Sequence, residues 1–371
     1  MNEPVIIDGD RLEAVETEWT DLWSDTLQRS PLLAWDHIKL WYSCFASPSE
    51  VRVYRVAVDD ELLGFLPLVL RDRVLSSLSN DHCMYSEPLV VPGKESEFQR
   101  QVISVLSDDC SSWDMLNYRF SYSFSICTGL ADDQTLSSAS LRFTRETQPT
   151  YTIALDGPVE DYFDSLGKNA RKTIRGARNR VKKAGAHSYL TYLGREAAEQ
   201  WHRFTEVEGS GWKGREGTSI ELESEAYQRY YDGLVRLLAE KDDLRLYFLE
   251  LEGETIAGGF GFVSGDNYQF AKSGYLEKHR DLSPSVLLLL HMYADIQENL
   301  PEVRRLHFFP WSYGYKDRYC SNADTCIDTT IYSPTARGAI RAGLSQARNF
   351  AKRVPGLKAM AELLRRGRGG D

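Results

Sequence analysis

The segment from His307 to Tyr319, HFFPWSYGYKDRY, holds the side chains best suited to acid–base chemistry. Its aromatic residues are too dense and too irregular for one face of a helix, and it follows a predicted strand, where the sites of α/β-type sheets gather. Tyr315 and Tyr319 offer hydroxyls, Lys316 an ammonium group and His307 an imidazole, which transfer protons or stabilise charge. The alternative is an aromatic core segment with a solvated lysine.

A second segment, residues 206–219 (EVEGSGWKGREGTS), combines four glycines and three acidic residues with Trp212 and Lys213. Glycine-rich loops are too flexible to be selected for packing and often carry function. A tryptophan beside a lysine in such a loop is suited to covering a ligand. The alternative is a surface loop anchored by one tryptophan.

A third segment, residues 282–285 (LSPS), precedes a predicted apolar helix over 285–299. Ser283 can cap this helix, and Pro284 suits its first position. The free N–H groups of such a start form an anion site suited to pyrophosphate, to which His279 and Arg280 can add positive charge. Structural capping alone is the alternative, because nearly every helix has such a start.

The stretch from Lys168 to Lys183 carries eight basic residues, among them Arg171 and Arg175, and no acidic one. They lie mostly off the apolar stripe, so one helix face is strongly cationic. A solvated face usually mixes charges. The pattern therefore favours an anionic ligand, such as a nucleotide phosphate, an acidic carrier or an RNA end, over a merely solvated face.

Other kinds of site find no support in the sequence. It has no GxSxG, no P-loop and no HExxH, and Gly258-Gly259-Phe260-Gly261 falls inside a predicted strand, where it cannot be a dinucleotide fingerprint. Six scattered cysteines lack zinc spacing and are typical of reduced thiols, so we expect no metal and a cytoplasmic protein. The acidic N-terminus shows no signal peptide, and no apolar run is long enough to span a membrane.

The elements that position these segments show an internal repeat. Residues 51–70 and 244–263 each predict an antiparallel hairpin around an acidic turn, and a gapless overlay places Arg52 on Arg245 and Tyr54 on Tyr247. In both halves the order is helix, hairpin, strand, helix, strand, which favours a duplication. A helical stripe is predicted over 160–184, with a break near Gly167. Strands at 139–146 and 150–155 are expected to connect the two units.

Length and charge also indicate two units. The chain has 371 residues and a net charge of -10, which argues against a nucleic-acid coat. Residues 1–150 hold 12 Lys and Arg against 24 Asp and Glu, whereas the remainder is near neutral. We predict domains at 1–150 and 151–334 and a basic amphipathic helical tail at 335–371. The tail is expected to pack on the second domain, with contact to a membrane surface or an anionic partner as the alternative.

In the same order, these segments resemble motifs of the GNAT-superfamily acyltransferases of the CelD/BcsL type, which are bacterial and related to the Fem aminoacyl transferases. The family's basic helix, Trp-Lys-Gly loop, Ser-Pro-Gly helix start and terminal Tyr-Lys are similar to residues 166–175, 211–218, 283–285 and 315–316. In the first half, residues 64–68 (GFLPL) resemble the family's Gly-x-x-Pro-Leu strand. The chain departs from the family at His307, Phe309, Trp311 and Ser285, which predicts a bulkier, less acidic pocket and an unusual acceptor.

The resemblance implies an α+β fold with two tandem GNAT-like domains, each a mixed, mostly antiparallel sheet flanked by helices, followed by the helical tail. The first domain is then a degenerate, supporting copy, and the second is catalytic. An acyl-CoA, with acetyl-CoA favoured, is implied as co-substrate, and its thioester would lie between residues 269–275 and 305–309. Its implied binding residues are Ser273, Arg280, Ser283, Ser285 and Val286.

The resemblance also implies direct attack of an amine on the thioester. Tyr315 or Tyr319 would protonate the leaving thiolate, Lys316 would stabilise charge, and His307 or Glu208 would act as base. The acceptor, a small amine or an amino sugar, would contact Trp212, Lys213, Arg171 and Arg175.

Two alternatives remain open at this point. A Fem-like transferase would take its acyl group from an aminoacyl-tRNA, and an acyl-carrier donor is conceivable for the same cationic helix. A non-catalytic binding module would explain the departures around His307. The oligomeric state and the acyl group stay undetermined.

Overall fold

The computed structural model describes residues 5–26, 30–122, 130–310, 314, 316–320 and 322–353. Within these residues, the strands are β1 Val5–Ile7, β2 Val51–Val58, β3 Glu61–Arg71, β4 Val74–Ser77, β5 Leu89–Val90, β6 Met115–Tyr122, β7 Arg142–Ala154, β8 His187–Leu193, β9 Leu244–Leu251, β10 Glu254–Ser264, β11 Asn267–Tyr275, β12 Arg305–Phe308 and β13 Asn322–Tyr332. The α-helices are α1 Glu16–Asp25, α2 Trp35–Phe45, α3 Glu95–Asp108, α4 Asp133–Ser138, α5 Val159–Ser165, α6 Lys168–Ala184, α7 Gly194–Glu199, α8 Trp201–Gly209, α9 Trp212–Glu216, α10 Glu225–Glu240, α11 Pro284–Asn299, α12 Lys316–Tyr319 and α13 Ala336–Arg353. Short 3-10 helices lie at Gly9–Val15, Pro31–Leu33, Pro48–Glu50 and Glu277–Leu282.

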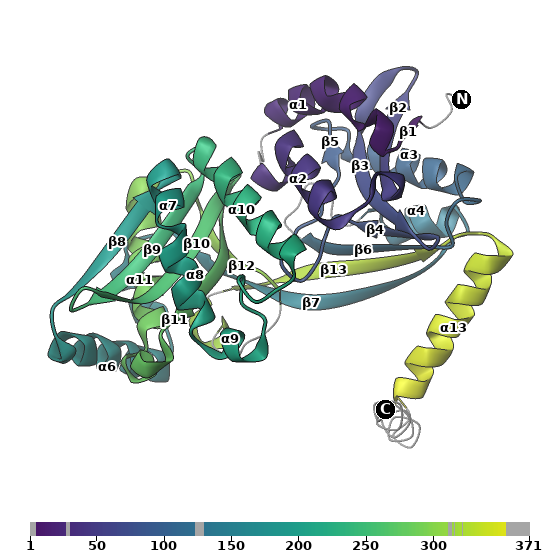
Figure 1. Cartoon of the computed structure of the whole chain (residues 1–371). Coiled ribbons are helices and arrows are strands. Elements are labelled where there is room, and N and C mark those ends of the chain that lie inside the picture. The colour runs from purple at the N-terminus through teal and green to yellow at the C-terminus, as the bar shows by residue number, and fades with distance from the viewer. Residues whose placement is uncertain are drawn as a thin grey trace, which may run out of the picture.

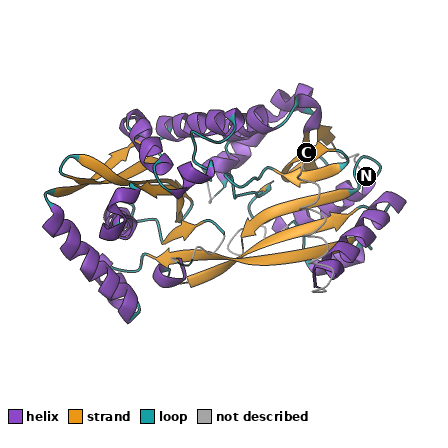
Figure 2. Ribbon diagram, turned by 60° about the horizontal axis from the view of Figure 1, so that its bottom comes forward, coloured by secondary structure: helices purple, strands orange, loops and turns teal. Residues whose placement is uncertain are grey.

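All strands join one mixed, mostly antiparallel sheet in the order β1-β2-β3-β4-β6-β13-β7-β12-β11-β10-β9-β8, with β5 on β3. Helices cover both sides of this strand layer (Figure 2). The two long central strands connect the halves, because β13 pairs with β6 on one side and with β7 on the other, while β7 also pairs with β12. The two connecting strands expected at 139–146 and 150–155 are thus the single strand β7, and residue 150 lies inside it.

The expected repeat is present in three dimensions. β2, β3, β4, α3 and β6 follow the same order as β9, β10, β11, α11 and β12. The overlaid tyrosines make matching contacts: the Tyr54 hydroxyl donates to the Asp109 carboxylate just beyond α3, at 2.7 Å, and the Tyr247 hydroxyl donates to Asp295 on α11, at 2.8 Å. The two halves therefore repeat side-chain packing as well as strand order.

Three apolar clusters hold the sheet and helices together. One packs α3 on the outer face of the first half, and another packs α6 and α11 on the outer face of the second half. The third is shared, because α1 and α2 of the first half meet α7, α8 and α10 of the second. Figure 1 shows α10 lying beside α2 at this junction. Burial in this shared cluster fixes the relative position of the halves.

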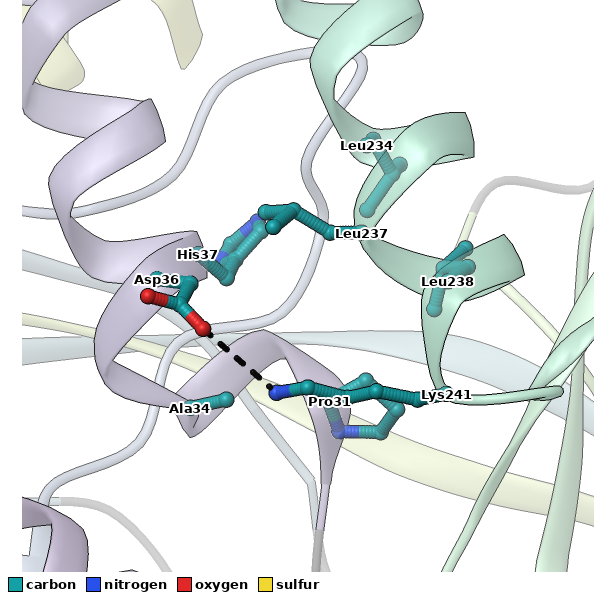
Figure 3. Close-up of a pocket in the computed structure, with 8 residues that line it drawn as sticks. All are labelled: Pro31, Ala34, Asp36, His37, Leu234, Leu237, Leu238 and Lys241. Carbon is teal, nitrogen blue, oxygen red and sulfur yellow. Dashed lines mark ion pairs between the residues drawn. The ribbon is translucent and has the colours of Figure 1, made fainter.

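Polar contacts supplement the junction. His37 on α2 accepts a hydrogen bond at Nε2 from the Tyr230 hydroxyl of α10, at 2.9 Å, and donates from Nδ1 to the Leu32 carbonyl. Beside it lies a small, mainly apolar pocket between α2 and α10, where Lys241 Nζ is 3.8 Å from Asp36 Oδ2 (Figure 3). This pocket lies apart from every segment that the sequence marks as chemical.

The stripe predicted over 160–184 forms α5 and α6, and Gly167 is the N-cap between them. The tail forms α13, but α13 does not pack on the second half as expected. It projects from the first-half end of the sheet (Figure 1), where Arg341 pairs with Asp114 and donates to the Asp72 carbonyl. No helix in the described part of the chain is long and apolar enough to cross a membrane.

Candidate functional site

Two parallel strands, β11 and β12, lie at the centre of the second half, and β11 extends past the end of β12. β11 pairs with β12 only from Asn267↔Arg305 to Phe270↔Phe308. The register against β10 then shifts by one residue, which leaves Ala271 as a β-bulge. Bulges bend a strand and re-aim its side chains. Within the described residues, the second half of β11 thus has a strand partner only on the β10 side.

Helix α11, which follows β11 in the chain and packs against it, is the candidate anion site. Ser283 is the N-cap, in a left-handed conformation with φ 54°, and Pro284 is the first residue of α11, as the sequence predicts. The Ser283 hydroxyl makes no capping bond and instead accepts from Arg180 of α6, at 3.2 Å. No acidic residue lies in the first turn, which holds Ser285 and Val286. The helix start therefore keeps its positive character for an anion.

Arg280, which is also predicted to lie at the start of α11, instead forms an ion pair within its own segment. Its side chain is largely exposed and pairs with Glu277 at 3.4 Å. Lys278 and His279 both contact Glu254. The positive side chain that reaches the helix start is therefore Arg180, which contributes through the packing of α6 against α11.

A buried charge cluster lies on the other side of β11. Glu208 at the end of α8 has no exposed side chain and accepts from Lys213 of α9 at 2.9 Å, from Lys272 of β11 at 3.5 Å and from the Ile220 N–H at 3.0 Å. Burial alone would raise the pKa of Glu208, but Lys213 and Lys272 outweigh burial and hold the pKa below its ordinary value. Glu208 is therefore a charged carboxylate at neutral pH.

For Lys272, burial has a larger effect on the pKa than the neighbouring charges. Burial lowers the pKa of Lys272 to about 8, although Glu208 raises it. Its Nζ lies 5.1 Å from the centre of the Tyr231 ring. An amine with this pKa exchanges protons readily near neutral pH, which is the property that acid–base catalysis requires.

The first half also reaches this cluster. His82, in the loop between β4 and β5, lies with Nδ1 3.1 Å from the Tyr231 hydroxyl and Nε2 3.3 Å from Glu223. Sequence reasoning missed both His82 and Lys272. His82 is 141 residues from Glu223 in the chain, and Lys272 stands in a strand without a motif. Strand β11 places Lys272 beside Glu208, and the packing of the first half against α10 brings His82 to the same cluster.

The predicted flexible loop at 206–219 is instead mostly helical. Its residues form the end of α8 and the short helix α9, where Lys213 also donates to the Ser273 carbonyl at 3.0 Å. A Cβ on Gly214 would lie 1.8 Å from the Gly209 carbonyl oxygen. The glycines here permit close packing of helix on helix. The Trp212 side chain lies outside the described atoms.

His307 on β12 is completely buried at the centre of the sheet. Its Nε2 is 2.9 Å from the Thr150 hydroxyl, which itself donates to the Phe308 carbonyl, and its Nδ1 is 2.6 Å from the Gln269 side-chain amide. Burial lowers the pKa of His307 to about 3, with Lys316 adding to the effect. The imidazole is therefore neutral at neutral pH, with both nitrogens engaged.

Lys316 lies just beyond the same strand, in α12. Its Nζ donates to the carbonyls of Phe309 and Pro310, and burial lowers the pKa of Lys316 to about 8. Tyr319, three residues later, packs in the core of the second half, where its carbonyl accepts from the Tyr162 hydroxyl. Tyr315 lies outside the described residues. Lys316 is thus placed at the end of β12, whereas Tyr319 holds α12 to the core.

The basic residues of α6 line its exposed face. Arg171 donates to the Asp164 carbonyl, and Arg175 and Arg178 both lie over the Phe163 ring, 5.3 Å from its centre. Within the described residues, none of the eight cations of α6 has a carboxylate in ion-pairing distance; those eight are Lys168, Arg171, Lys172, Arg175, Arg178, Arg180, Lys182 and Lys183. The face is cationic without internal compensation.

Comparisons with known proteins agree with this geometry. Residues 168–317 match the family model described as an acetyltransferase (GNAT) domain. In fold, the chain is similar to FemX, with a TM-score of 0.55 and 11% identity over 86% of this chain and 96% of FemX. It is similar to the C-terminal domain of a putative lysylphosphatidylglycerol synthetase from Agrobacterium fabrum, with a TM-score of 0.54 and 11% identity over 91% of this chain and 97% of that one. No curated protein sequence matches the chain.

The family match covers the basic helix α6, the strands β9 to β12 and α11, and the fold likeness covers both halves. Residues 168–317 therefore match a GNAT domain, and the chain as a whole shares its fold with FemX.

Proposed function

We propose that the protein transfers an acyl group from acyl-CoA to the amine of a small molecule or amino sugar. The observation that carries the proposal is that β11 runs past the end of β12, next to a helix start that is free of acidic residues and is reached by Arg180. The N–H group of Ser285 suits the donor pyrophosphate, as in the GNAT superfamily, whereas the Val286 N–H donates to the Ser283 carbonyl at 3.2 Å. The edge of β11 around Ser273 offers backbone groups to the acyl carbonyl.

Two buried lysines supply the proton transfers in this proposal. The acceptor nitrogen attacks the thioester carbon, a C–N bond forms, and the C–S bond breaks. Neutral Lys272 takes the proton of the attacking amine, and the Lys316 ammonium gives a proton to the leaving thiolate. Both groups have a pKa of about 8, close to where such catalysis works best.

The other candidate bases fit less well. His307 has both ring nitrogens engaged and a pKa of about 3. Glu208 is held as a carboxylate by two lysines, so we assign it the task of positioning Lys272 and Lys213. The acceptor would approach from the side of α9, near Trp212.

The test combines binding with turnover. Calorimetric titration should detect CoA or acetyl-CoA, and Lys272→Met should reduce kcat by about 10²–10⁴-fold while leaving CoA affinity unchanged. Lys278→Met is the matched control, because Lys278 is exposed and paired with Glu254. Failure of the wild type to bind any acyl-CoA would refute the proposal, and an active Lys272→Met variant would refute the proton route.

A second candidate function rests on α6. Its eight cations, which have no ion pair within the described residues, extend over a helix of 17 residues, ~25 Å long. This length exceeds what a pyrophosphate needs. This observation favours a macromolecular donor, an aminoacyl-tRNA as the Fem resemblance implies. Gel-shift titration with tRNA should then show binding that Lys172→Glu with Lys182→Glu abolishes. Absence of tRNA binding by the wild type leaves the acyl-CoA proposal alone.

A non-catalytic module is distinguished by the same assays, because it turns over no donor of either kind. We also infer a cytoplasmic location, since the described cysteines, at 44, 83, 110, 320 and 326, are all free thiols.

A further inference from the structure

The C-terminal segment differs sharply in charge from the rest of the chain. Residues 335–371 hold nine Lys and Arg against two Asp and Glu, a net charge of +7 in a protein whose total is -10. The helix α13 alone contains five basic residues and no acidic one. Positive charge is thus concentrated on an element that the acyl-transfer proposal does not use.

The described part of α13 also exposes apolar side chains. Ile340 is 63% exposed and Leu344 is 65% exposed, on successive turns of the same helix face. The helix is held to the body by another side: Ala342 is buried, and a Cβ on Gly338 would lie 2.2 Å from the Ser333 carbonyl oxygen. Arg341 adds the contact to Asp114 at 3.4 Å. The attachment therefore leaves the apolar stripe exposed within the described residues.

Charge decides which occupant this face suits. Pairing of two α13 helices would bring cationic surfaces together with no acidic residue on either helix to compensate. A nucleic acid would satisfy the cations but leave Ile340 and Leu344 in water. An anionic bilayer surface satisfies both, because apolar side chains enter the acyl boundary while Lys and Arg meet the headgroups.

We propose that α13 docks the protein on an anionic lipid surface. Arg337, which is exposed, lies next to the apolar stripe on the helical wheel, as does Arg348 further along the sequence. The rest of the chain has a net charge of -17, which such a surface repels, and its one strongly cationic helix described above, α6, belongs to the other half of the molecule (Figure 1). The helix, ~27 Å long, would therefore make the first contact while the body stays above the membrane.

Vesicle sedimentation tests this proposal with the full chain. Wild type should pellet with vesicles of phosphatidylcholine and phosphatidylglycerol, should bind phosphatidylcholine alone much more weakly, and should dissociate in high salt. Ile340→Ser with Leu344→Ser should weaken binding by about tenfold or more, since both side chains lose their apolar burial. Leu222→Ser is the matched control, because Leu222 is 60% exposed in the second half; it should bind as wild type.

Three outcomes would overturn the inference. They are absence of wild-type binding to the anionic vesicles, wild-type binding by the Ile340/Leu344 double variant, and equal binding to neutral vesicles. Light scattering adds a fourth: a dimer that the double variant dissociates would show that a second copy covers this face. Thermal unfolding of the double variant should match that of wild type, which confirms that any loss of binding is not a loss of fold.

Discussion

The two halves share strand order and helix placement, yet their corresponding helix starts differ in charge. In the first half, α3 begins after Lys94 with Glu95 and Glu97 in its first turn, and the Gly93 N–H donates to Glu95. In the second half, α11 begins with no acidic residue and with Arg180 at its N-cap. The first helix start already carries its own anions, whereas the second is free to take one from a ligand.

The strands next to these helices also differ between the halves, in the chain that lies beside them. In the first half, the region beside β6 is occupied by the chain between β4 and β5: the Tyr122 hydroxyl donates to the Met84 carbonyl, and the Arg119 N–H donates to the Ser77 hydroxyl. In the second half, β12 ends at Phe308 and β11 continues beyond it. The same architecture can therefore support the fold in one half and form a site in the other. The difference lies in the chain beside the central strands and in the charge at the helix start.

The largest expected effect comes from giving α11 the charge of α3. Ser285→Glu places a carboxylate in the first turn, as Glu95 and Glu97 do in α3, and should weaken CoA binding by about 100-fold while leaving thermal stability unchanged or slightly raised. Calorimetric titration measures the affinity. Ser285→Gln, which has the same size without the charge, should bind within a fewfold of wild type. If Ser285→Glu binds as wild type, the helix start is not the donor site.

A smaller effect is expected where the halves meet. Burial, aided by Lys272, lowers the pKa of His82 to about 3 from its ordinary 6.5, so the folded protein binds fewer protons than the unfolded chain between these values. Stability from this group is present above pH 6.5 and is lost as the pH falls, by roughly 2 kcal/mol at pH 5. His37, with a pKa lowered to about 4 by burial, acts in the same direction.

Denaturant unfolding at pH 7 and pH 5 measures this loss. His82→Gln should lose less stability between the two values than wild type, because its unfolded chain lacks the titrating group. His187→Gln, at an exposed position, is the control and should keep the wild-type pH dependence. Equal pH dependence in His82→Gln and wild type would contradict a neutral, buried His82 at the junction.

The smallest expected effect distinguishes the supporting first half from the second half, in which we place the site. Tyr122→Phe removes one hydrogen bond from the filled region of the first half, and Tyr162→Phe removes the one to Tyr319 in the second. Each should lower the free energy of unfolding by about 1 kcal/mol. Only Tyr162→Phe should also reduce kcat, because α12 carries Lys316. A loss of kcat in Tyr122→Phe alone would reverse the roles that we assign to the halves.

Much of the fold was predictable because its signals are local. The stripe in 160–184, the Ser-Pro start of α11 and the two hairpins follow from periodicity and capping, which depend on neighbours within a few residues. The error at 206–219 has a physical cause: glycines that suggest a flexible loop instead allow α9 to pack against the end of α8.

By itself, the sequence predicted the GNAT resemblance, the repeat and the cationic helix, because residue types and their spacing carry these properties. It also placed Lys316, Glu208 and Lys213 among the candidates. Only the tertiary structure decided the protonation of Lys316 and Glu208, since a pKa depends on burial and on partners far away in the chain. It likewise brought Lys272 and His82 to the cluster around Glu208, because strand pairing and the packing of the two halves join residues that no local pattern connects.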